Sequence, residues 1–299
     1  MDGREEPADG CEELAARFEG ERGRLRAVAH RMLGSAAEAE DAVQEAWLRL
    51  GRADAAAVEN LPGWLTTVVS RICLDLLRAR AVRREEPAGE RLPDGAGEDG
   101  GPEEAALLAE EVGRALLVVL DRLGPAERVA FVLHDGFAVP FEQIAPIVGR
   151  TTVAAKKLAS RARQRVRGPA AVPAAELAGH REVVEAFLAA SRGGDLDALL
   201  AVLAPDVVRR ADPAALPAGR AAVARGALVV AGETLVFGRR ARFAAPALVN
   251  GDVGVVVAPG GRLRLVLLVT VERGRVAAYE VIADPERIAR LDLALLPDG

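Results

Sequence analysis

The sequence has few of the residues on which metal and thiol chemistry depend. It holds two cysteines, Cys11 and Cys73, and three histidines that are spread over about 150 residues. No Cys or His residues stand at the spacing of zinc ligands, so a structural zinc site is excluded. The two cysteines are expected to remain free thiols in a reducing compartment.

Long apolar segments are missing as well. The longest apolar runs, such as Ala115–Leu120 and Leu265–Val271, are far shorter than the roughly 18 residues that cross a bilayer. The opening MDGREEPADG is acidic and lacks an apolar stretch, so no signal peptide is expected. These absences predict a cytoplasmic protein.

Aromatic residues make up only 3% of the 299 residues, whereas hydrophobic residues make up 51% and charged residues 28%. Ala, Val and Leu must therefore form most of the core, which is typical of closely packed helices. At roughly 150 residues per domain, the length predicts about two domains.

The net charge is −5, but the charges are distributed unevenly along the chain. Residues 71–84 hold five arginines and one acid, and residues 150–167 hold seven basic residues and no acid. Between them, residues 85–111 hold ten acids and one base. Two basic segments separated by an acidic one predict two surfaces that bind a polyanion.

The spacing of apolar residues predicts helices throughout residues 12–84. Apolar side chains between Leu25 and Leu33 recur at intervals of three and four, which places them on one helix face. Ser35, followed by Glu38 three residues later, is typical of a capping box at the start of the next helix. The segment 60–63 (NLPG) interrupts the pattern, and one long helix is expected from Trp64 to Arg84.

Residues 85–104 are rich in Gly, Pro and acids and are expected to form a solvated linker, which could also screen the basic segments. A second helical unit is expected in residues 105–168, with helices over 110–123, 124–134, 141–148 and 151–167. A helix, a short turn at Gly149 and a basic helix form the pattern of a helix-turn-helix.

The second helix of such a motif enters the DNA major groove. The residues expected to face the bases are Thr151, Thr152, Ala155, Lys156 and Ser160, whereas Val153, Ala154 and Leu158 are expected to pack inward. The residues expected to meet phosphates are Lys157, Arg161, Arg163 and Arg165. Because no acid in the segment can pair with these cations along the helix, the pattern favours DNA binding over a merely solvated face.

A short linker, residues 169–177, leads to residues 178–296, where the pattern changes. Helices are expected over 180–191 and 196–203, and Asp206 is interpreted as a helix-end or turn residue. Segments 244–249, 253–258, 262–272 and 275–283 are expected to form an antiparallel sheet, with the Asn250-Gly251 dipeptide as a hairpin turn. Helices against such a sheet make an α+β domain.

Several long stretches resemble a known family. LRAVAHRMLGSAAEAEDAVQEAWLRL and LPGWLTTVVSRICLDLLRARAVRR resemble region 2 of the extracytoplasmic-function (group IV) sigma factors of bacterial RNA polymerase. RALLVVLDRLGPAERVAFVLHDGF and PFEQIAPIVGRTTVAAKKLASRARQRVR resemble sigma region 4. AFLAASRGGDLDALLAVLAPDVV and IADPERIARL resemble the SnoaL-like domain that is fused to one group of these factors.

The resemblance implies a multidomain protein with region 2 in residues 12–84, region 4 in 105–168 and a SnoaL-like α+β cone in 178–296. It implies core RNA polymerase and promoter DNA as partners, transcription initiation as the function, and neither a catalytic role nor a cofactor. The residues expected on the −35 element are Thr151, Thr152, Lys156, Lys157, Ser160, Arg161, Arg163 and Arg165. Those expected on the −10 element are Asn60, Leu61, Trp64, Arg71, Arg78, Arg80, Arg83 and Arg84. Asp41, Gln44 and Glu45 are expected on polymerase.

The C-terminal domain offers four candidate acid–base residues, Asp206, Asp252, Tyr279 and Glu280, which form no distinctive constellation. We therefore expect this domain to regulate the sigma modules in cis, through a small-molecule or protein signal. One alternative is a SnoaL-like enzyme of the cyclase or isomerase class with a helical targeting module, which a cavity lined by Asp or His would favour. Another is a stand-alone helix-turn-helix regulator, which would bind DNA tightly without polymerase.

Overall fold

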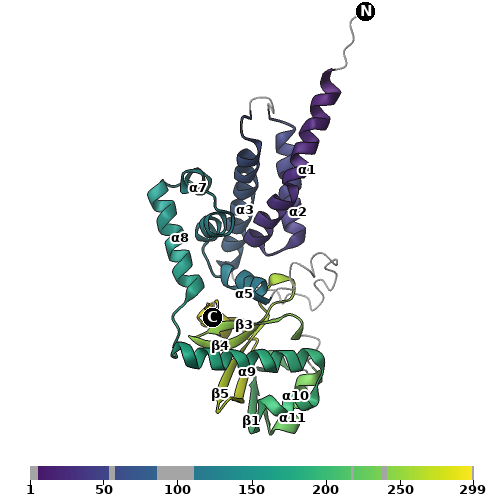
Figure 1. Ribbon diagram of the computed structural model, residues 1–299, viewed down its shortest axis with the longest axis vertical. Coiled ribbons are helices and arrows are strands. Elements are labelled where there is room, and N and C mark those ends of the chain that lie inside the picture. Colours follow the sequence, from purple (N-terminus) through teal and green to yellow (C-terminus); the bar gives the residue numbers. More distant parts are fainter. Residues whose placement is uncertain (1–5, 54–57, 86–110, 217–218, 237–240, 298–299) are drawn as a thin grey trace, which may run out of the picture. The chain divides into compact units, whose positions relative to one another are not determined.

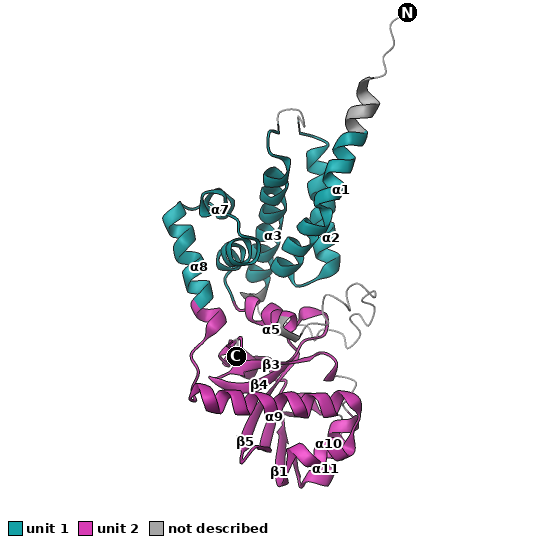
Figure 2. Cartoon of the chain, viewed as in Figure 1, with its two compact units in different colours: residues 1–98, 123–163 teal, residues 99–122, 164–299 magenta. Residues whose placement is uncertain are grey.

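The computed structural model describes residues 6–53, 58–85, 111–216, 219–236 and 241–297 (Figure 1). The chain forms two compact units, residues 1–98 with 123–163 and residues 99–122 with 164–299 (Figure 2). Most of the predicted 85–104 linker lies outside the described residues. Helices build the first unit, whereas a sheet with helices builds the second.

Three long helices form a bundle in the first unit: α1 (Glu6–Leu33), α2 (Ala36–Leu50) and α3 (Leu61–Glu85). Leu25, Met32 and Leu65 are fully buried between them. The predicted cap at Ser35 is confirmed, because its Oγ accepts a 3.4 Å hydrogen bond from the Glu38 N–H.

The third helix begins at Leu61, three residues before the predicted start at Trp64. Asn60 Oδ1 accepts a 3.0 Å hydrogen bond from the Gly63 N–H and so satisfies one backbone donor of the first turn. Pro62 suits this turn because it has no N–H to satisfy and its φ is already close to the helical value. The segment interpreted as a break is therefore the helix start itself.

Most of the basic helix also lies in the first unit. α6 (Pro125–Phe131) continues into a π-helical turn, η2 (Val132–Gly136), and is followed by α7 (Phe141–Val148) and α8 (Thr152–Arg167). Gly149 ends α7 with φ 67°, a conformation that favours glycine, and Thr151 Oγ1 caps α8 by accepting from the Ala154 N–H at 3.2 Å. The predicted helix-turn-helix is thereby confirmed.

The second unit holds a seven-stranded sheet in the order β2-β1-β6-β5-β4-β3-β7 within the described residues. Its strands are β1 (Leu203–Ala211), β2 (Val223–Arg225), β3 (Ala244–Val249), β4 (Asp252–Val257), β5 (Leu265–Glu272), β6 (Arg275–Ile282) and β7 (Leu293–Ala294). Its helices are α5 (Glu111–Leu120), α9 (Ala174–Gly193), α10 (Leu196–Val202), α11 (Ala227–Val236) and α13 (Pro285–Ala289), with short 3-10 turns η3 (Pro213–Ala215) and η4 (Pro259–Gly261).

The sheet is mixed, not wholly antiparallel as predicted, because β1 pairs with β6 in parallel. The four predicted strands are present as β3 to β6, and Asn250 and Gly251 form the predicted hairpin turn with φ 51° and 86°. The interpretation of Asp206 as a helix-end or turn residue is wrong. It lies inside β1, a strand that pairs with the short strand β2 and with β6. Local patterns do not reveal the parallel pairing with β6, which comes about 70 residues later in the chain.

Helices cover both faces of the sheet. Alternate β3 and β4 residues belong to a core with α9, α10 and α11: Ala244, Leu248, Val253, Val255 and Val257. The intervening residues form a separate core with Ala115 and Val118 of α5: Ala245, Ala247, Val249, Val256 and Ala258. Two covered faces explain why both strands are apolar at nearly every position.

Reactive groups are few in the described part of the chain. Burial raises the pKa of the Cys73 thiol to about 12, so that this side chain stays protonated at neutral pH. The Cys11 side chain lies outside the described residues. No group of His, Cys, Asp and Glu suited to a metal ion occurs among the described side chains, and no described helix is long and apolar enough to cross a membrane.

Candidate nucleic-acid interface and C-terminal cavity

The α8 helix presents a cationic surface to solvent. Lys156, Lys157 and Arg161 are exposed, as are Thr151, Ser160 and Arg165, whereas Thr152 and Arg163 are partly buried. The other side of the helix is closed by small residues, since Ala155, Ala159 and Ala162 are completely buried. Six of the eight predicted −35 residues are therefore exposed on one helix.

The predicted orientation of α8 is wrong at its first turn. Ala155 was expected to face DNA and Val153 to pack inward, but Ala155 is buried and the side chain of Val153 is 65% exposed. Ala155 belongs to a buried stripe that continues through Ala159, Ala162 and Val166 at intervals of three and four residues, and Val153 lies outside this stripe.

Acids from neighbouring elements pair with part of this surface. Arg163 Nε donates to Asp135 at 2.6 Å, and Arg161 Nε lies 3.3 Å from Glu127. The Lys156 ammonium lies 5.9 Å from the centre of the Phe141 ring. These contacts orient the basic side chains without burying them, so the surface stays available to phosphates.

The arginines of α3 have different surroundings. Arg71, Arg78 and Arg83 are exposed, and Arg71 Nη2 donates to the Pro146 carbonyl at 3.4 Å. Arg80 is partly buried, donates to the Leu33 carbonyl at 2.9 Å and pairs with Glu38. The Arg84 side chain lies outside the described residues. Arg80 thus already ties α3 to the end of α1 and the start of α2.

The start of α3 holds the other residues predicted on the −10 element. Asn60 is exposed, Trp64 is partly exposed, and Leu61 is only 3% exposed. Leu61 belongs to the core of the bundle, so its side chain would have to leave that core to meet a base. On α2, Asp41 and Gln44 are exposed, and Glu45 accepts from Arg49 Nε at 2.9 Å.

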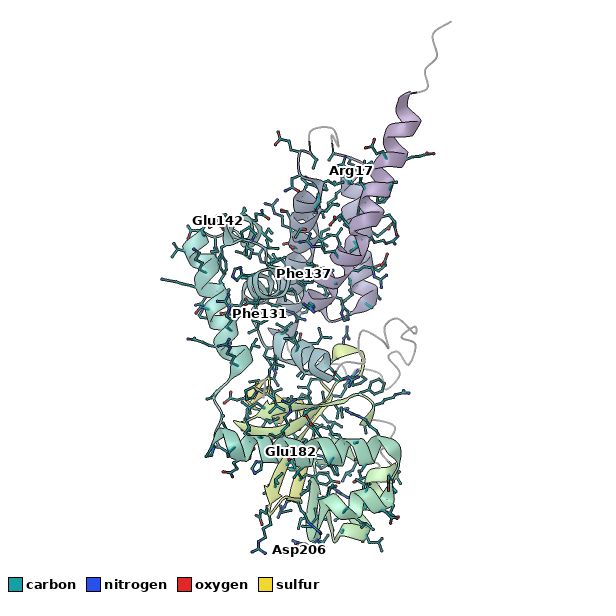
Figure 3. The ribbon with its side chains drawn as sticks, in the orientation of Figure 1. Arg17, Phe131, Phe137, Glu142, Glu182 and Asp206 are labelled. Carbon is teal, nitrogen blue, oxygen red and sulfur yellow. The ribbon has the colours of Figure 1, made fainter. Side chains whose placement is uncertain are left out.

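Three of the four acid–base candidates of the C-terminal domain lie away from any shared site. Asp206 is exposed on β1 (Figure 3), Asp252 contacts His180 Nδ1 at 2.7 Å, and Glu280 accepts from Arg287 at 2.7 Å. Tyr279 alone lines a cavity, of about 120 Å³. Burial raises the pKa of Tyr279, so that the phenol stays neutral.

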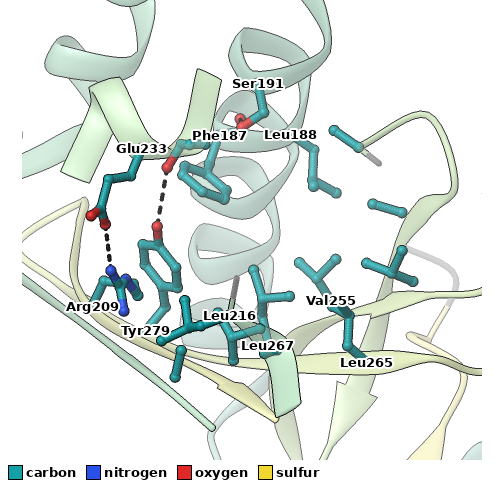
Figure 4. Close-up of a pocket in the computed structure, with 17 residues that line it drawn as sticks. Phe187, Leu188, Ser191, Arg209, Leu216, Glu233, Val255, Leu265, Leu267 and Tyr279 are labelled. Atoms are coloured by element: carbon teal, nitrogen blue, oxygen red, sulfur yellow. Dashed lines mark hydrogen bonds and ion pairs between the residues drawn. The ribbon is translucent and has the colours of Figure 1, made fainter. Parts of the chain in front are cut away.

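The cavity lies between α9 and the sheet (Figure 4). Its wall is mostly aliphatic, and Glu233 is the single carboxylate among the lining residues, which include neither Asp nor His. Glu233 is bound to Arg209 Nη2 at 2.5 Å, so this carboxylate is held in an ion pair and is poorly suited to abstract a proton. Sequence reasoning missed both residues, although Val207, Arg209 and Ala211 alternate in a way that places Arg209 on the buried face of β1.

Two family models match this chain, and each match includes most of one of the two basic helices, α3 and α8. The family model of Sigma-70 region 2 matches residues 18–83, and that of Sigma-70 region 4 matches residues 113–166. The ECF RNA polymerase sigma factor SigJ of Mycobacterium tuberculosis is 42% identical over 286 residues, which cover 90% of this chain and 91% of the relative. The chain belongs to the ECF RNA polymerase sigma factors.

Other relatives of this sigma factor match at similar length. The probable ECF sigma factor SigI of M. tuberculosis is 35% identical over 284 residues and covers 92% of this chain and 94% of SigI. A crystal structure of M. tuberculosis SigJ covers 92% of this chain and 98% of that chain, with 39% identity and a TM-score of 0.46. The two sigma regions are followed in this sigma factor by the C-terminal α+β domain.

The region 4 match of this sigma factor spans both compact units. Its middle lies in the first unit, but α5 and the last turn of α8 belong to the second. Arg114 Nη1 donates to the Ala244 carbonyl at 3.0 Å, and the Leu295 N–H donates to the Val166 carbonyl at 2.8 Å. The first helix of region 4 is thus a structural part of the C-terminal domain.

The second unit of this sigma factor also contains a buried acid, Asp212. Asp212 follows β1, accepts hydrogen bonds from the N–H groups of Ala283 and Asp284 at 3.1 Å and pairs with Arg287. Burial alone would raise the pKa of Asp212, but the hydrogen bonds from Asp284, Arg287 and Ala283 together hold it below the ordinary value. Asp212 thereby joins the end of β1 to the start of α13.

Proposed function

We propose that this sigma factor directs core RNA polymerase to promoters by placing α8 on the −35 element and the exposed arginines of α3 on the −10 element. The observation that carries the proposal is the open cationic side of α8 opposite its buried alanine stripe. The two basic surfaces fall one in each matched sigma region. Phosphate contacts from such surfaces supply affinity and register, and a few side chains at the start of α8 supply the sequence reading.

The partner surfaces follow from the same assignment. The polar side of α2, with the exposed Asp41 and Gln44 and the partly exposed Glu45, is proposed to bind core RNA polymerase. The protein is proposed to act in the cytoplasm, where polymerase works. Asn60 and Trp64 are proposed to contact an unpaired −10 base, because both are accessible at the start of α3.

In vitro transcription of genomic fragments with core polymerase tests this function. We expect Lys156→Glu/Lys157→Glu to reduce promoter-specific transcripts at least tenfold, since two phosphate-facing cations become anions. Arg275→Glu, an equally exposed site at the start of β6, serves as the matched control and should leave transcription unchanged. Unchanged transcripts with the double variant, or tight promoter-specific binding without polymerase, would refute the proposal.

The C-terminal domain is proposed to regulate the factor in cis through α5 and the end of α8. Ala115 and Val118 of α5 are buried in a core made otherwise by the C-terminal segment. Whatever changes the packing of that core also changes the anchoring of the first region 4 helix. This supports a mechanical route from the C-terminal domain to region 4.

Transcription by Val118→Asp and by a chain that ends at Gly168 tests the regulatory route. Both changes remove the contact between α5 and the sheet, so both should change promoter output at least threefold and in the same direction. Val229→Asp, at an exposed position of α11, is the matched control. Circular dichroism establishes that each variant is folded, and unchanged output from folded variants would exclude regulation by this route.

A further inference from the structure

The cavity of the C-terminal domain has an apolar floor that is set by the register of the sheet. Ala211 on β1 lies beside Val281 on β6, which lies beside Leu267 on β5, which in turn lies beside Val255 on β4. All four residues line the cavity, so a continuous aliphatic row crosses the sheet beneath it. Phe187 and Leu188 of α9 close the opposite side. An apolar molecule would be enclosed between these two walls.

The polar groups gather at one side of this cavity. Figure 4 shows Arg209, Glu233 and Tyr279 close together, with Val255 and Leu265 at the other side. Arg209 and Tyr279 are partners in the register of β1 and β6, which places them on the same face of the sheet. The cavity therefore has a polar side and an apolar side.

The hydroxyl groups that line the cavity already donate their hydrogen bonds to other groups of the protein. Ser191 Oγ donates to the Phe187 carbonyl at 2.7 Å, and Thr234 Oγ1 donates to the Val230 carbonyl at 2.8 Å. Because a hydroxyl has one hydrogen, the 3.0 Å contact between Thr234 and Tyr279 is donated by the phenol. The three lining hydroxyls thus retain lone pairs for a ligand but no hydrogen to give.

The charges that line the cavity cancel. Arg209 donates to Glu233 at 2.5 Å and to the Ala221 carbonyl at 2.9 Å, and its side chain is 5% exposed. The second oxygen of Glu233 lies 3.5 Å from Arg220. A charged ligand would have to break this pair and leave one buried charge uncompensated, which is costly.

We propose that the cavity binds a small, neutral, largely apolar molecule that carries one hydrogen-bond donor, a hydroxyl or an N–H, directed at the Tyr279 oxygen. A cavity of about 150 Å³ that is lined by Leu, Ile and Phe holds benzene, so about 120 Å³ beneath α9 suits a ligand of one ring. The proposal deepens the cis-regulatory role by naming the chemical class of the signal. Its test uses no polymerase, so failure to bind and failure to regulate are distinguishable.

Isothermal titration calorimetry of the full-length protein with three matched probes tests whether binding depends on a hydrogen-bond donor in the ligand. Phenol donates a hydrogen bond, anisole has the same ring and oxygen without a donor, and benzoate carries a charge. We expect phenol to bind about fivefold to tenfold more tightly than anisole, because one hydrogen bond contributes about that much. Binding of benzoate should be weaker than that of phenol by tenfold or more.

Substitutions of residues that line the cavity test whether the probes bind there. Tyr279→Phe should abolish the preference for phenol over anisole while both still bind. Leu267→Trp, or Ala215→Leu at the milder position in η3, should fill the cavity and prevent binding, whereas Leu228→Trp on the exposed side of α11 should not. Thermal unfolding identifies the filled variants that fold. The proposal would be overturned by an unchanged preference in Tyr279→Phe, by unchanged binding to a folded variant with a filled cavity, by tighter binding of benzoate than of phenol, or by no binding of any probe.

Discussion

Arginine and lysine serve two different purposes in the two units of this sigma factor. On α8, Lys156 and Lys157 are exposed, whereas Glu127 and Asp135 pair with the neighbouring Arg161 and Arg163. In the cavity wall, Arg209 is almost completely buried and held by Glu233 and a backbone carbonyl. A basic side chain on an exposed helix face can bind a polyanion, whereas a basic side chain in a buried ion pair contributes to the stability of the fold.

The largest effect is expected where the buried pair is broken. Arg209→Ala leaves the Glu233 carboxylate in an apolar wall with only the more exposed Arg220 nearby, so unfolding should become easier by about 3 kcal/mol. Urea unfolding followed by circular dichroism measures this loss. Arg210→Ala, at the next and exposed residue of β1, is the matched control and should stay within about 0.5 kcal/mol. Equal losses in the two variants would erase the contrast between buried and exposed arginines.

A smaller and pH-dependent effect is expected at Asp212. Asp212→Asn should cost about 1–2 kcal/mol at pH 7, because a charge-assisted network loses its anion. The pKa of Asp212 is lowered in the folded protein, so its contribution is present above the ordinary value of 3.8 and is lost as the pH falls through the lower folded value.

Urea midpoints at pH 7, 5 and 3 measure the difference between Asp212→Asn and the unchanged protein. That difference should shrink toward zero at the lowest pH. Asp206→Asn, at an exposed site on the same strand, should show no such trend. A difference that is independent of pH would mean that packing, rather than the charge of Asp212, stabilises this corner.

The smallest change in folding free energy is expected on α8. Lys157→Ala should alter stability by less than about 0.5 kcal/mol, because the side chain is exposed. In the polymerase complex, however, the slope of log affinity for promoter DNA against log salt concentration should fall by about one unit. Filter binding at several salt concentrations gives the slope, and an unchanged slope would remove Lys157 from the phosphate contacts.

Local signals in the sequence were sufficient for much of the fold. Ser35 and Asp195 accept hydrogen bonds from their own first turns, so residues close in sequence determine where those helices begin. The Asn250-Gly251 turn sets the β3–β4 hairpin in the same local way. The basic character of α8 is likewise visible in the residues themselves.

Long-range pairing accounts for what sequence reasoning missed. The strand β1 contains Pro205, and one of its two partners, β6, runs parallel to it and comes about 70 residues later, so no hairpin turn links these two strands. Arg209 and Glu233 come from different elements and acquire a role only when the sheet and α11 are assembled. At the first turn of α8, the small Ala155 is buried and the larger Val153 is exposed, which is the reverse of what side-chain hydrophobicity alone predicts.

The double covering of β3 and β4 has a consequence for how such a chain can be divided. A fragment that begins after Gly168 would carry a sheet whose Ala245, Ala247 and Val249 side chains have lost Ala115 and Val118 as partners. Exposed strand faces of this kind promote aggregation. A graft of this domain onto another protein, by engineering or by gene fusion, would therefore have to bring along a helix encoded some fifty residues upstream of the apparent boundary.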